Sequence, residues 1–205
     1  MKKGIFVIVL SAICLTTLHA GAYESQFGFS VDLPSHWNVV NMKNLKNNPE
    51  KYYNAHNDKL RNIDESFLKK NEKELLAGKV EIYVNLSANY DNFNDNIYVQ
   101  MDHGDVKPLR AMEKAICNVN MLQAAFSRSF GRAVNVYACR VVKVSSYDAI
   151  YMDFDGASPG TRAIQYQIWK PSNDIIIMTL TTKNKNLEKL RDDFTAIIYS
   201  FKVTK

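Results

Sequence analysis

Four strand-like runs near the end of the chain are separated by turns too short to allow many connections. The turns are marked by Ser145-Ser146, by the small residues 157–160 and by Pro171. Parallel neighbours need a crossover of about a dozen residues or more, whereas short turns join antiparallel ones. The spacing therefore predicts four consecutive antiparallel strands. They cover 134–144, 147–154, 162–169 and 175–182.

Apolar residues also alternate with polar ones at four places upstream, which predicts further strands. Pro34 ends the first of these runs, and the Asx-rich stretch 92–96 supplies a tight turn before the last. The predicted strands are Phe27–Leu33, Trp37–Val40, Val80–Leu86 and Ile97–Met101.

Three segments have apolar residues at helical spacing. Residues 44–77 predict one long or two shorter amphipathic helices. A second helix opens at Pro108 and ends near Gly131. The last helix starts with Asn186 as its N-cap and continues to Phe201. The apolar stripe of the second helix contains Leu109, Met112, Ile116, Val119, Leu122 and Phe126.

Helices packed on a contiguous, mainly antiparallel sheet make an α+β fold of the α/β/α sandwich type. No internal repeat, low-complexity tract or Pro/Gly-rich linker divides the chain. We therefore expect one domain over residues 23–205, with 44–77 as its long helical segment.

Residues 1–22 have the layout of a secretory signal peptide. Lys2 and Lys3 precede the apolar run 5–18, and small residues follow it, which predicts cleavage after Ala22 or, alternatively, after Ala20. The apolar run is short for a membrane span, and no later segment is apolar for long enough. We expect a soluble, exported protein that is periplasmic or secreted.

The cysteines agree with export. Cys14 belongs to the leader, where Ile13 precedes it and the apolar run continues after it, so we expect no lipoprotein. Cys117 and Cys139 remain as an even pair, and disulfides persist in oxidising compartments. A Cys117–Cys139 bond would stabilise the fold by about 3 kcal/mol. The alternative is two buried thiols.

The charge excludes a nucleic-acid footprint. The formal charge of +5 falls to about +3 without the two leader lysines. Basic and acidic residues alternate in stretches such as 69–74, which is typical of solvated helix faces.

Two parts of the chain resemble the PsbP-like superfamily. Near the start the chain reads Phe-Gly-Phe-Ser-Val-Asp-Leu-Pro-Ser-His-Trp over residues 27–37, and the closing helix ends in Ile-Tyr-Ser-Phe-Lys over 198–202. The turn at 155–157 and the run Tyr-Gln-Ile-Trp at 166–169 are also similar. The resemblance implies an α/β/α sandwich on an antiparallel sheet. The family includes accessory subunits of the photosynthetic oxygen-evolving apparatus and exported bacterial proteins of unknown role, and it implies no shared catalytic residues.

Three histidines follow the leader. His103 lies in Asp102-His103-Gly104-Asp105, where an imidazole and carboxylates would form an acid–base pair if folding supplied further partners. The alternative is a polar loop at a strand end. We expect His36 to pack at the sheet edge and His56 to lie on the apolar stripe of its helix.

Three short motifs have simpler explanations than chemistry. Ser66-Phe67-Leu68-Lys69 matches S-x-x-K without its companion K-T-G, and it lies in a charged amphipathic segment. Asp153-Phe154-Asp155-Gly156 has part of a calcium-loop pattern, but a strand-end turn explains it. Asn85-Leu86-Ser87 is a glycosylation sequon in mid-strand. We expect neither a metal nor a cofactor.

Aromatic residues on the late strands are candidates for ligand binding. Tyr147, Tyr151, Tyr166 and Trp169 would form a platform for a peptide, a glycan or a small apolar ligand if they shared an exposed face, with His103 as a further candidate. The alternative is that a helix covers them as core.

These observations predict a non-catalytic exported module that binds a protein or other envelope or extracellular macromolecule, in an oligomeric state left open. The rival prediction is a small secreted hydrolase or transferase with its site near His103.

Overall fold

The protein contains two antiparallel sheets. The computed structural model describes residues 21–47, 65–86 and 93–204. The larger sheet has seven strands in the order β3-β4-β5-β9-β8-β7-β6, and the smaller has the order β1-β2-β10. The strands are β1 (Gly21–Ser25), β2 (Phe29–Leu33), β3 (Trp37–Val40), β4 (Val80–Asn85), β5 (Asn96–His103), β6 (Val136–Val144), β7 (Tyr147–Asp155), β8 (Thr161–Trp169), β9 (Asp174–Lys183) and β10 (Lys202–Val203).

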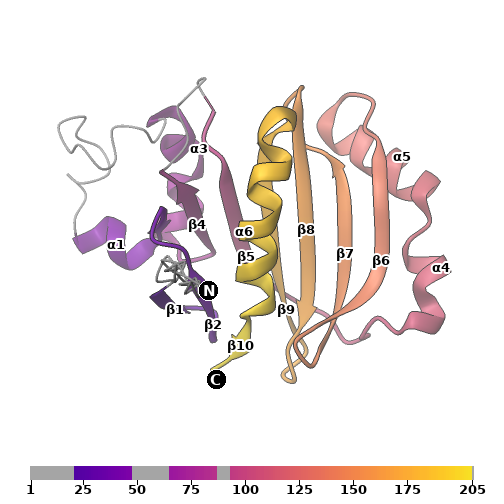
Figure 1. The fold of residues 1–205 in the computed structure, drawn as a ribbon, viewed down its shortest axis with the longest axis horizontal. Helices are drawn as coiled ribbons and strands as arrows, with labels where there is room; N and C mark the ends of the chain where they lie inside the picture. The colour runs from indigo at the N-terminus through magenta and orange to yellow at the C-terminus, as the bar shows by residue number, and fades with distance from the viewer. Residues whose placement is uncertain (1–20, 48–64, 87–92, 205) are drawn as a thin grey trace, which may run out of the picture.

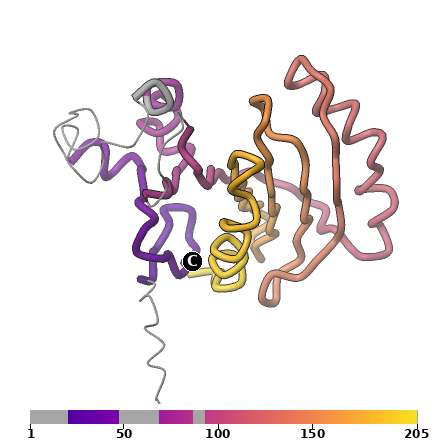
Figure 2. The backbone as a smooth tube through the Cα atoms, turned by 45° about the horizontal axis from the view of Figure 1, so that its top comes forward, coloured from indigo at the N-terminus to yellow at the C-terminus, as the bar shows by residue number. Residues whose placement is uncertain are grey.

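The helices lie on both faces of the seven-stranded sheet. Helix α6 crosses one face, and α3 and α5 lie at opposite ends of the molecule with the strands between them (Figures 1 and 2). This arrangement is the α+β sandwich that the sequence predicts. The helices are α1 (Met42–Asn47), α3 (Glu65–Leu76), α4 (Glu113–Ile116), α5 (Val119–Phe130) and α6 (Leu187–Tyr199), with single 3-10 turns η1 (Arg110–Met112) and η2 (Asn184–Asn186).

The four late strands pair in chain order, which confirms the predicted meander. Tyr151 lies opposite Tyr166, and Gln165 lies opposite Thr179. Strand β9 then pairs with β5, which joins the meander to β4 and β3. The sequence prediction missed β1, whose first residues it assigned to the leader, and the two-residue β10.

The prediction of one continuous helix over 108–131 is wrong, because the segment contains two separate helices, α4 and α5. The helical path ends at Cys117, and Asn118 starts α5 by accepting a hydrogen bond from the Met121 amide at 3.2 Å. Several residues of the expected apolar stripe are consequently exposed, with Leu109 55% and Val119 40% accessible.

Helix α6 and the smaller sheet build the main core on one face of the larger sheet. Phe194 is 1% exposed and packs against Tyr166, and Phe201 stacks on Phe29 with ring centroids 4.9 Å apart. Asn186 stands at the predicted N-terminus of α6, but its amide donates to the buried Asp95 carboxylate at 3.2 Å instead of capping the helix.

A buried carboxylate fastens the β1–β2 hairpin to this face. Glu81 of β4 is 0% exposed and accepts hydrogen bonds from the Tyr23 hydroxyl, the backbone amide of Gln26 and the Tyr83 hydroxyl. Burial, followed by the Glu81 charge, holds the pKa of Tyr83 well above its usual value. The hairpin is thus positioned by a satisfied polar contact as well as by apolar packing.

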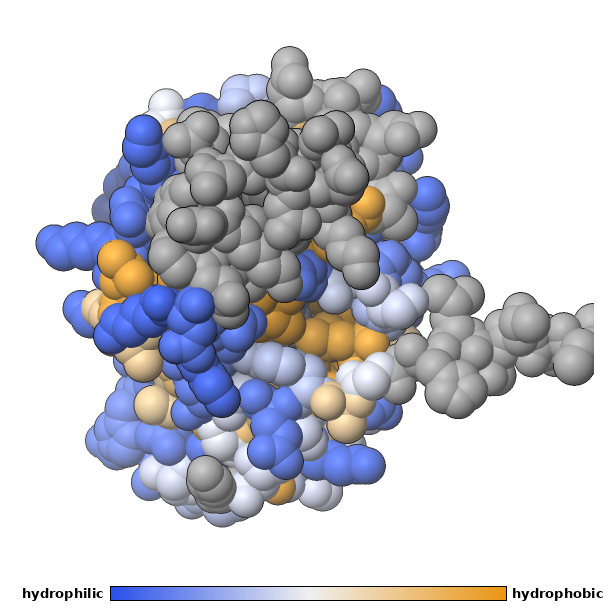
Figure 3. Space-filling model, turned by 90° about the vertical axis from the view of Figure 1, so that its left-hand side faces the viewer, coloured by the Kyte–Doolittle hydropathy of each residue, from blue (hydrophilic) through white to orange (hydrophobic). Residues whose placement is uncertain are grey.

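A second, smaller core lies on the opposite face, at the end that carries α1 and α3. Leu45 of α1 and Leu75 of α3 pack there on Val80, Ile82 and Val84 of β4. The surface at this end shows an apolar strip bordered by hydrophilic side chains (Figure 3).

The predicted disulfide is present. Cys117, at the end of α4, is bonded to Cys139 of β6, with the two Cα atoms 5.2 Å apart. The bond ties the helical segment that precedes α5 to the edge strand of the sheet. Within the described ranges, no helix is both long enough and apolar enough to cross a bilayer.

Candidate ligand groove on the sheet face opposite α6

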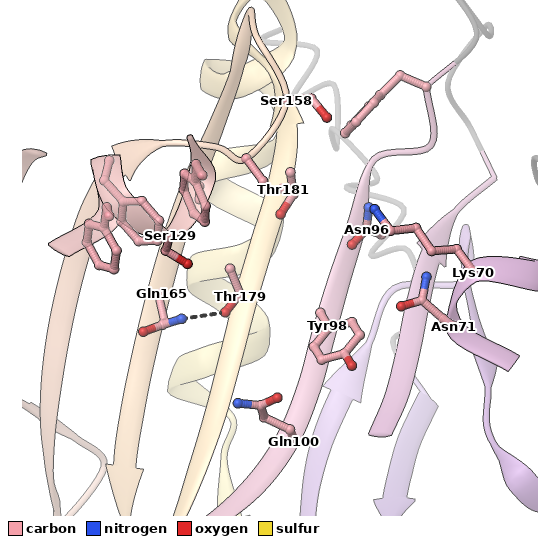
Figure 4. A pocket seen from close by; sticks show the side chains of 16 residues that line it. Lys70, Asn71, Asn96, Tyr98, Gln100, Ser129, Ser158, Gln165, Thr179 and Thr181 are labelled. Carbon is pink, nitrogen blue, oxygen red and sulfur yellow. Dashed lines mark hydrogen bonds between the residues drawn. The ribbon is translucent and has the colours of Figure 1, made fainter. Parts of the chain in front are cut away.

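A groove runs between α3 and α5 on the face of the large sheet that α6 does not cover. Helix α3 packs on β4, and α5 packs on β6 and β7, so the faces of β5, β9 and β8 form the floor between them. The cavity has a volume of about 570 Å³ and is lined by sixteen described residues (Figure 4). That volume lies within the range of about 300–1,000 Å³ that is usual for ligand sites.

The floor consists of amide and hydroxyl side chains from neighbouring strands. Tyr98, Thr179 and Gln165 occupy one row across β5, β9 and β8, and Asn96 and Thr181 are partners in the next row. The Gln165 amide donates to the Thr179 hydroxyl at 2.8 Å (Figure 4). The pleat places them together because alternate residues of a strand share one face.

A polar chain of hydrogen bonds holds Gln165 in position. Gln167, two residues along β8, donates from its side-chain amide to the Gln165 Oε1 atom at 2.9 Å. Gln165 therefore uses its oxygen toward Gln167 and its nitrogen toward Thr179. Such a network fixes the orientation of an amide that would otherwise rotate freely.

Phenyl rings make one wall of the groove. Phe126 of α5 stacks on Phe154 of β7, with ring centroids 4.4 Å apart and planes 15° apart. Phe130 lies one turn further along α5, 6.1 Å from Phe126 and inclined by 12° to it. The three rings are nearly parallel; Phe154 is buried behind Phe126, so the partly exposed Phe126 and Phe130 supply most of the accessible aromatic surface of the wall.

The opposite wall and rim are polar. Lys70 and Asn71 project from α3, beside Asn96 of the floor (Figure 4). Burial, followed by the charge of Glu74, raises the pKa of Tyr98. Tyr98 therefore stays neutral at physiological pH, and the floor carries no formal charge.

Arg132 connects the end of α5 to the turn between β7 and β8. It follows the C-terminus of α5 and donates to the carbonyls of Gly156, Ala157 and Ser158, which form the turn between β7 and β8. A Cβ on Gly156 would collide with the Thr161 side chain, so this turn requires glycine there. The end of α5 and the turn residues that line the groove are thereby held together.

The predicted exposed aromatic platform does not form. Tyr151 and Tyr166 are 6% and 7% exposed beneath α6, whereas Trp169 is buried on the other sheet face, and Tyr147 packs edge-on against Phe201. Burial raises the pKa of Tyr166 to about 12, with the neighbouring Tyr199 as the next cause. Strand alternation separates Trp169 from the tyrosines, and α6 covers the tyrosine face.

His103 lies at the end of β5, outside the lining of the groove. Its side chain is 63% exposed, with Nε2 3.5 Å from an Asp105 oxygen and Nδ1 3.6 Å from an Asp174 oxygen. A hydrogen bond from Ser172 lowers the pKa of Asp174; burial opposes this shift, and a hydrogen bond from His103 adds to it. The expected nearness of imidazole and carboxylates is present, but on an exposed strand end.

The carboxylates of the calcium-like motif have protein partners. Asp153 is paired with Arg162, and its second oxygen is 3.8 Å from Arg191. Burial tends to raise the pKa of Asp155, but hydrogen bonds from the Asn135 backbone, Tyr137 and the Asn135 side chain lower it overall. Within the described residues, no group of three or more His, Cys, Asp or Glu side chains is arranged to hold a metal ion.

The remaining predicted residues lie elsewhere. His36 donates a hydrogen bond from Nε2 to the Asp193 carboxylate at 2.6 Å, at the edge of the sheet beside α6. Asn85 of the sequon is buried in β4. His56, residues 1–20 and the side chain of Ser66 lie outside the described residues.

The sequence contains a signal for the groove in the polar residues of β8 and β9. Gln165 and Gln167 alternate with apolar residues along β8, and Thr179 and Thr181 do the same along β9. Polar residues on two central strands indicate a face that no apolar layer covers. Periodicity alone did not show that these two faces adjoin Phe126 of α5.

The fold resembles solved structures of low sequence identity. The sequence matches no protein-family model and no curated protein. The solution structure of cyanobacterial PsbP from Synechocystis sp. PCC 6803 aligns with a TM-score of 0.55 and 11% identity, over 95% of this chain and 98% of that one. This similarity shows that the chain has a PsbP-like fold, as its two end motifs imply.

Two further alignments have lower scores. LpqN of Mycobacterium tuberculosis, described as involved in cell envelope biogenesis, aligns with a TM-score of 0.49 and 10% identity over 86% of this chain and 83% of that one. A Pseudomonas aeruginosa protein of unknown function aligns with a TM-score of 0.44 and 12% identity, over 89% and 95% of the two chains. Neither contributes to the assignment of fold or function.

Proposed function

We propose that this chain is an exported, non-catalytic binding module whose ligand site is the groove between α3 and α5. After removal of its leader it acts as one domain, and it holds a segment of a protein or other envelope or extracellular macromolecule. The observation that supports the proposal most directly is the groove itself, with its amide and hydroxyl floor and its wall of three phenyl rings.

The lining suits recognition better than reaction. Amides and hydroxyls orient a ligand by hydrogen bonds, and aromatic rings supply contact area, which is the composition typical of binding pockets. An acid–base site requires a proton donor and acceptor in hydrogen-bond reach of each other within a cleft. His103 has carboxylates at 3.5 and 3.6 Å, but it lies on an exposed strand end and not in a cleft. Its geometry therefore supports the rival hydrolase proposal less than the groove supports binding.

Export is supported by two independent features. One is the leader-like pattern over residues 1–22, and the other is the Cys117–Cys139 bond, which persists in oxidising compartments. Gly21 and Ala22 form the start of β1, so cleavage after Ala20 would leave this strand whole. N-terminal sequencing of the exported protein distinguishes that site from cleavage after Ala22.

The test of the function is a capture experiment in which the groove is filled. The disulfide-bonded protein is immobilised and exposed to envelope and secreted fractions of the organism that encodes it. Thr179→Trp places a large ring on the groove floor, whereas Lys143→Trp places the same ring at an exposed position of β6. We expect the wild type and Lys143→Trp to retain the same macromolecule, and Thr179→Trp to lose it.

Circular dichroism and thermal unfolding establish that both tryptophan variants remain folded. Equal retention of the partner by Thr179→Trp and the wild type would place binding elsewhere and refute the groove as the site. Loss of a slow hydrolytic activity in His103→Ala, measured on the same fractions, would favour the rival proposal.

A further inference from the structure

We infer that the ligand held in this groove is a neutral glycan chain; the inference rests on the proposed binding function. It follows from the chemistry of the floor, the aromatic wall and the absence of free strand edges along the floor.

The floor offers paired donors and acceptors without charge. The side-chain amides of Asn96, Gln100 and Gln165 each donate and accept, as do the hydroxyls of Thr179 and Thr181. Sugar hydroxyls and acetamido groups also donate and accept, so they pair with such side chains in either direction. A cationic ligand would call for negative charge, which none of the sixteen described lining residues carries. An anionic ligand would call for several positive charges, whereas Lys70 on the α3 wall is the single lysine or arginine among the described lining residues.

The aromatic wall complements the other side of a sugar ring. A pyranose presents hydroxyl groups around its rim and an apolar C–H surface on its face. Phe126 and Phe130 lie on successive turns of α5, with planes only 12° apart, and both are partly buried and partly accessible from the groove. A ring face resting on this wall would direct its hydroxyls toward the polar floor.

The dimensions suit a short chain of sugars. From Asn96 to Gln100 the floor extends along β5 by about 14 Å, at about 3.4 Å per residue. Across β5, β9 and β8 it is about 10 Å wide, at about 4.8 Å between neighbouring strands. The floor therefore measures about 14 by about 10 Å, and the cavity above it has a volume of about 570 Å³.

An extended peptide fits this floor less well. Peptides that bind sheets usually add a strand to an exposed edge, where backbone groups are unpaired. Strands β5, β9 and β8 each have a hydrogen-bonded neighbour on both sides, so the floor presents side chains and no backbone edge. This distinction favours the glycan.

The inference is tested by titrating the disulfide-bonded protein with chitotetraose, cellotetraose and maltotetraose. Binding is followed by isothermal calorimetry and by NMR shifts of backbone amides. We expect at least one neutral tetrasaccharide to bind with a millimolar or lower dissociation constant. The perturbed amides should lie along Asn96–Gln100, Ala163–Gln165 and Thr179–Thr181.

Three variants locate the contacts. Phe126→Ala removes the central ring of the wall and should weaken binding about tenfold. Gln165→Leu keeps the approximate size of the side chain but removes its hydrogen bonds, and should weaken binding by a similar factor. Tyr199→Ala removes an aromatic ring, 59% exposed, from α6, and should leave binding unchanged.

The outcomes separate this inference from the proposed function. If none of the tetrasaccharides binds while capture of a macromolecule remains sensitive to Thr179→Trp, the glycan inference is wrong and the groove still binds another ligand. If saccharide binding is equally strong in Phe126→Ala, Gln165→Leu and Tyr199→Ala, the glycan site is not this groove. If neither saccharide nor macromolecule binds in a groove-dependent manner, both proposals fail.

Discussion

Helices α5 and α6 have nearly the same length and a similar amphipathic pattern, yet they pack very differently. The 13-residue α6 buries five side chains in the main core: Leu187, Leu190, Phe194, Ile197 and Ile198. The 12-residue α5 buries none of its side chains fully. Its apolar residues are only partly covered, because α5 lies toward the sheet edge and faces the groove with one side.

The difference in burial shows that α6 is part of the hydrophobic core, whereas α5 forms one wall of the groove. Helix α6 is held by apolar burial, since it packs beside the smaller sheet on one face of the larger sheet (Figure 1). Helix α5 is held at its two ends, by the Cys117–Cys139 bond before it and by the Arg132 contacts after it. A groove wall fixed at its ends keeps its rings accessible, because its apolar side does not need to be buried completely.

The largest contrast is expected from removing one phenylalanine from each helix. Phe194→Ala empties a site that is 1% exposed and should cost about 3–5 kcal/mol of unfolding free energy. Phe126→Ala removes a partly buried ring and should cost about 1–2 kcal/mol, mainly its contact with Phe154. Urea unfolding measures both, and equal losses would contradict the distinction between core and wall.

Breaking the disulfide should affect α5 more than α6. Closing a loop between residues 22 positions apart contributes about 3 kcal/mol in the chain-entropy model, and this loss of global stability accelerates exchange everywhere. We expect Cys117→Ser with Cys139→Ser to accelerate amide hydrogen exchange in α5 more than in α6, because α5 also loses its local attachment to β6. Uniform acceleration along both helices would show that α5 is an integral part of the core.

The N-cap of α5 offers a smaller and more local test. Asn118→Ala removes the acceptor for the Met121 amide and should cost about 1 kcal/mol, seen as fraying of the first turn. Asn120→Ala, at an exposed position of the same helix, serves as the control. An equal effect of the two substitutions would exclude capping as the cause.

The last test measures how stability changes with pH, and a change is expected only in alkaline solution. Burial raises the pKa of Tyr166 to about 12, whereas a tyrosine in the unfolded chain titrates near 10.0. The folded state therefore holds this proton more tightly, so the stabilisation is complete below pH 10.0 and is lost as the pH rises toward about 12. Tyr166→Phe should flatten the alkaline decrease in stability measured by urea unfolding, while Tyr199→Phe, on the exposed side of α6, should alter it less.

Much of the fold could be predicted because it depends on local patterns. Short turns such as Ser145-Ser146 identified the meander, and alternation identified β4 and β5. Cys117 and Cys139 are the two cysteines outside the apolar run near the start of the sequence, which made them an obvious pair. The break at Cys117-Asn118 was not predicted, because the apolar spacing continues across it while the backbone does not.

The candidate site was mostly invisible to the same patterns. The aromatic residues Tyr151 and Tyr166 stood out in the sequence, but they belong to the core. The useful residues were the less conspicuous Gln165 and Thr179, which come together only through the register of β8 and β9. A ring from α5 then completes the groove from outside the sheet.

Strand alternation shows that the two faces of a strand differ, and helical spacing shows that a helix has an apolar side. These properties depend on neighbouring residues, so they could be read along the chain. How far each apolar side is covered depends instead on which elements meet across the sheet. Here α6 meets the centre of one face and α5 only an edge of the other, and that placement leaves the polar floor beside Phe126 accessible to a ligand.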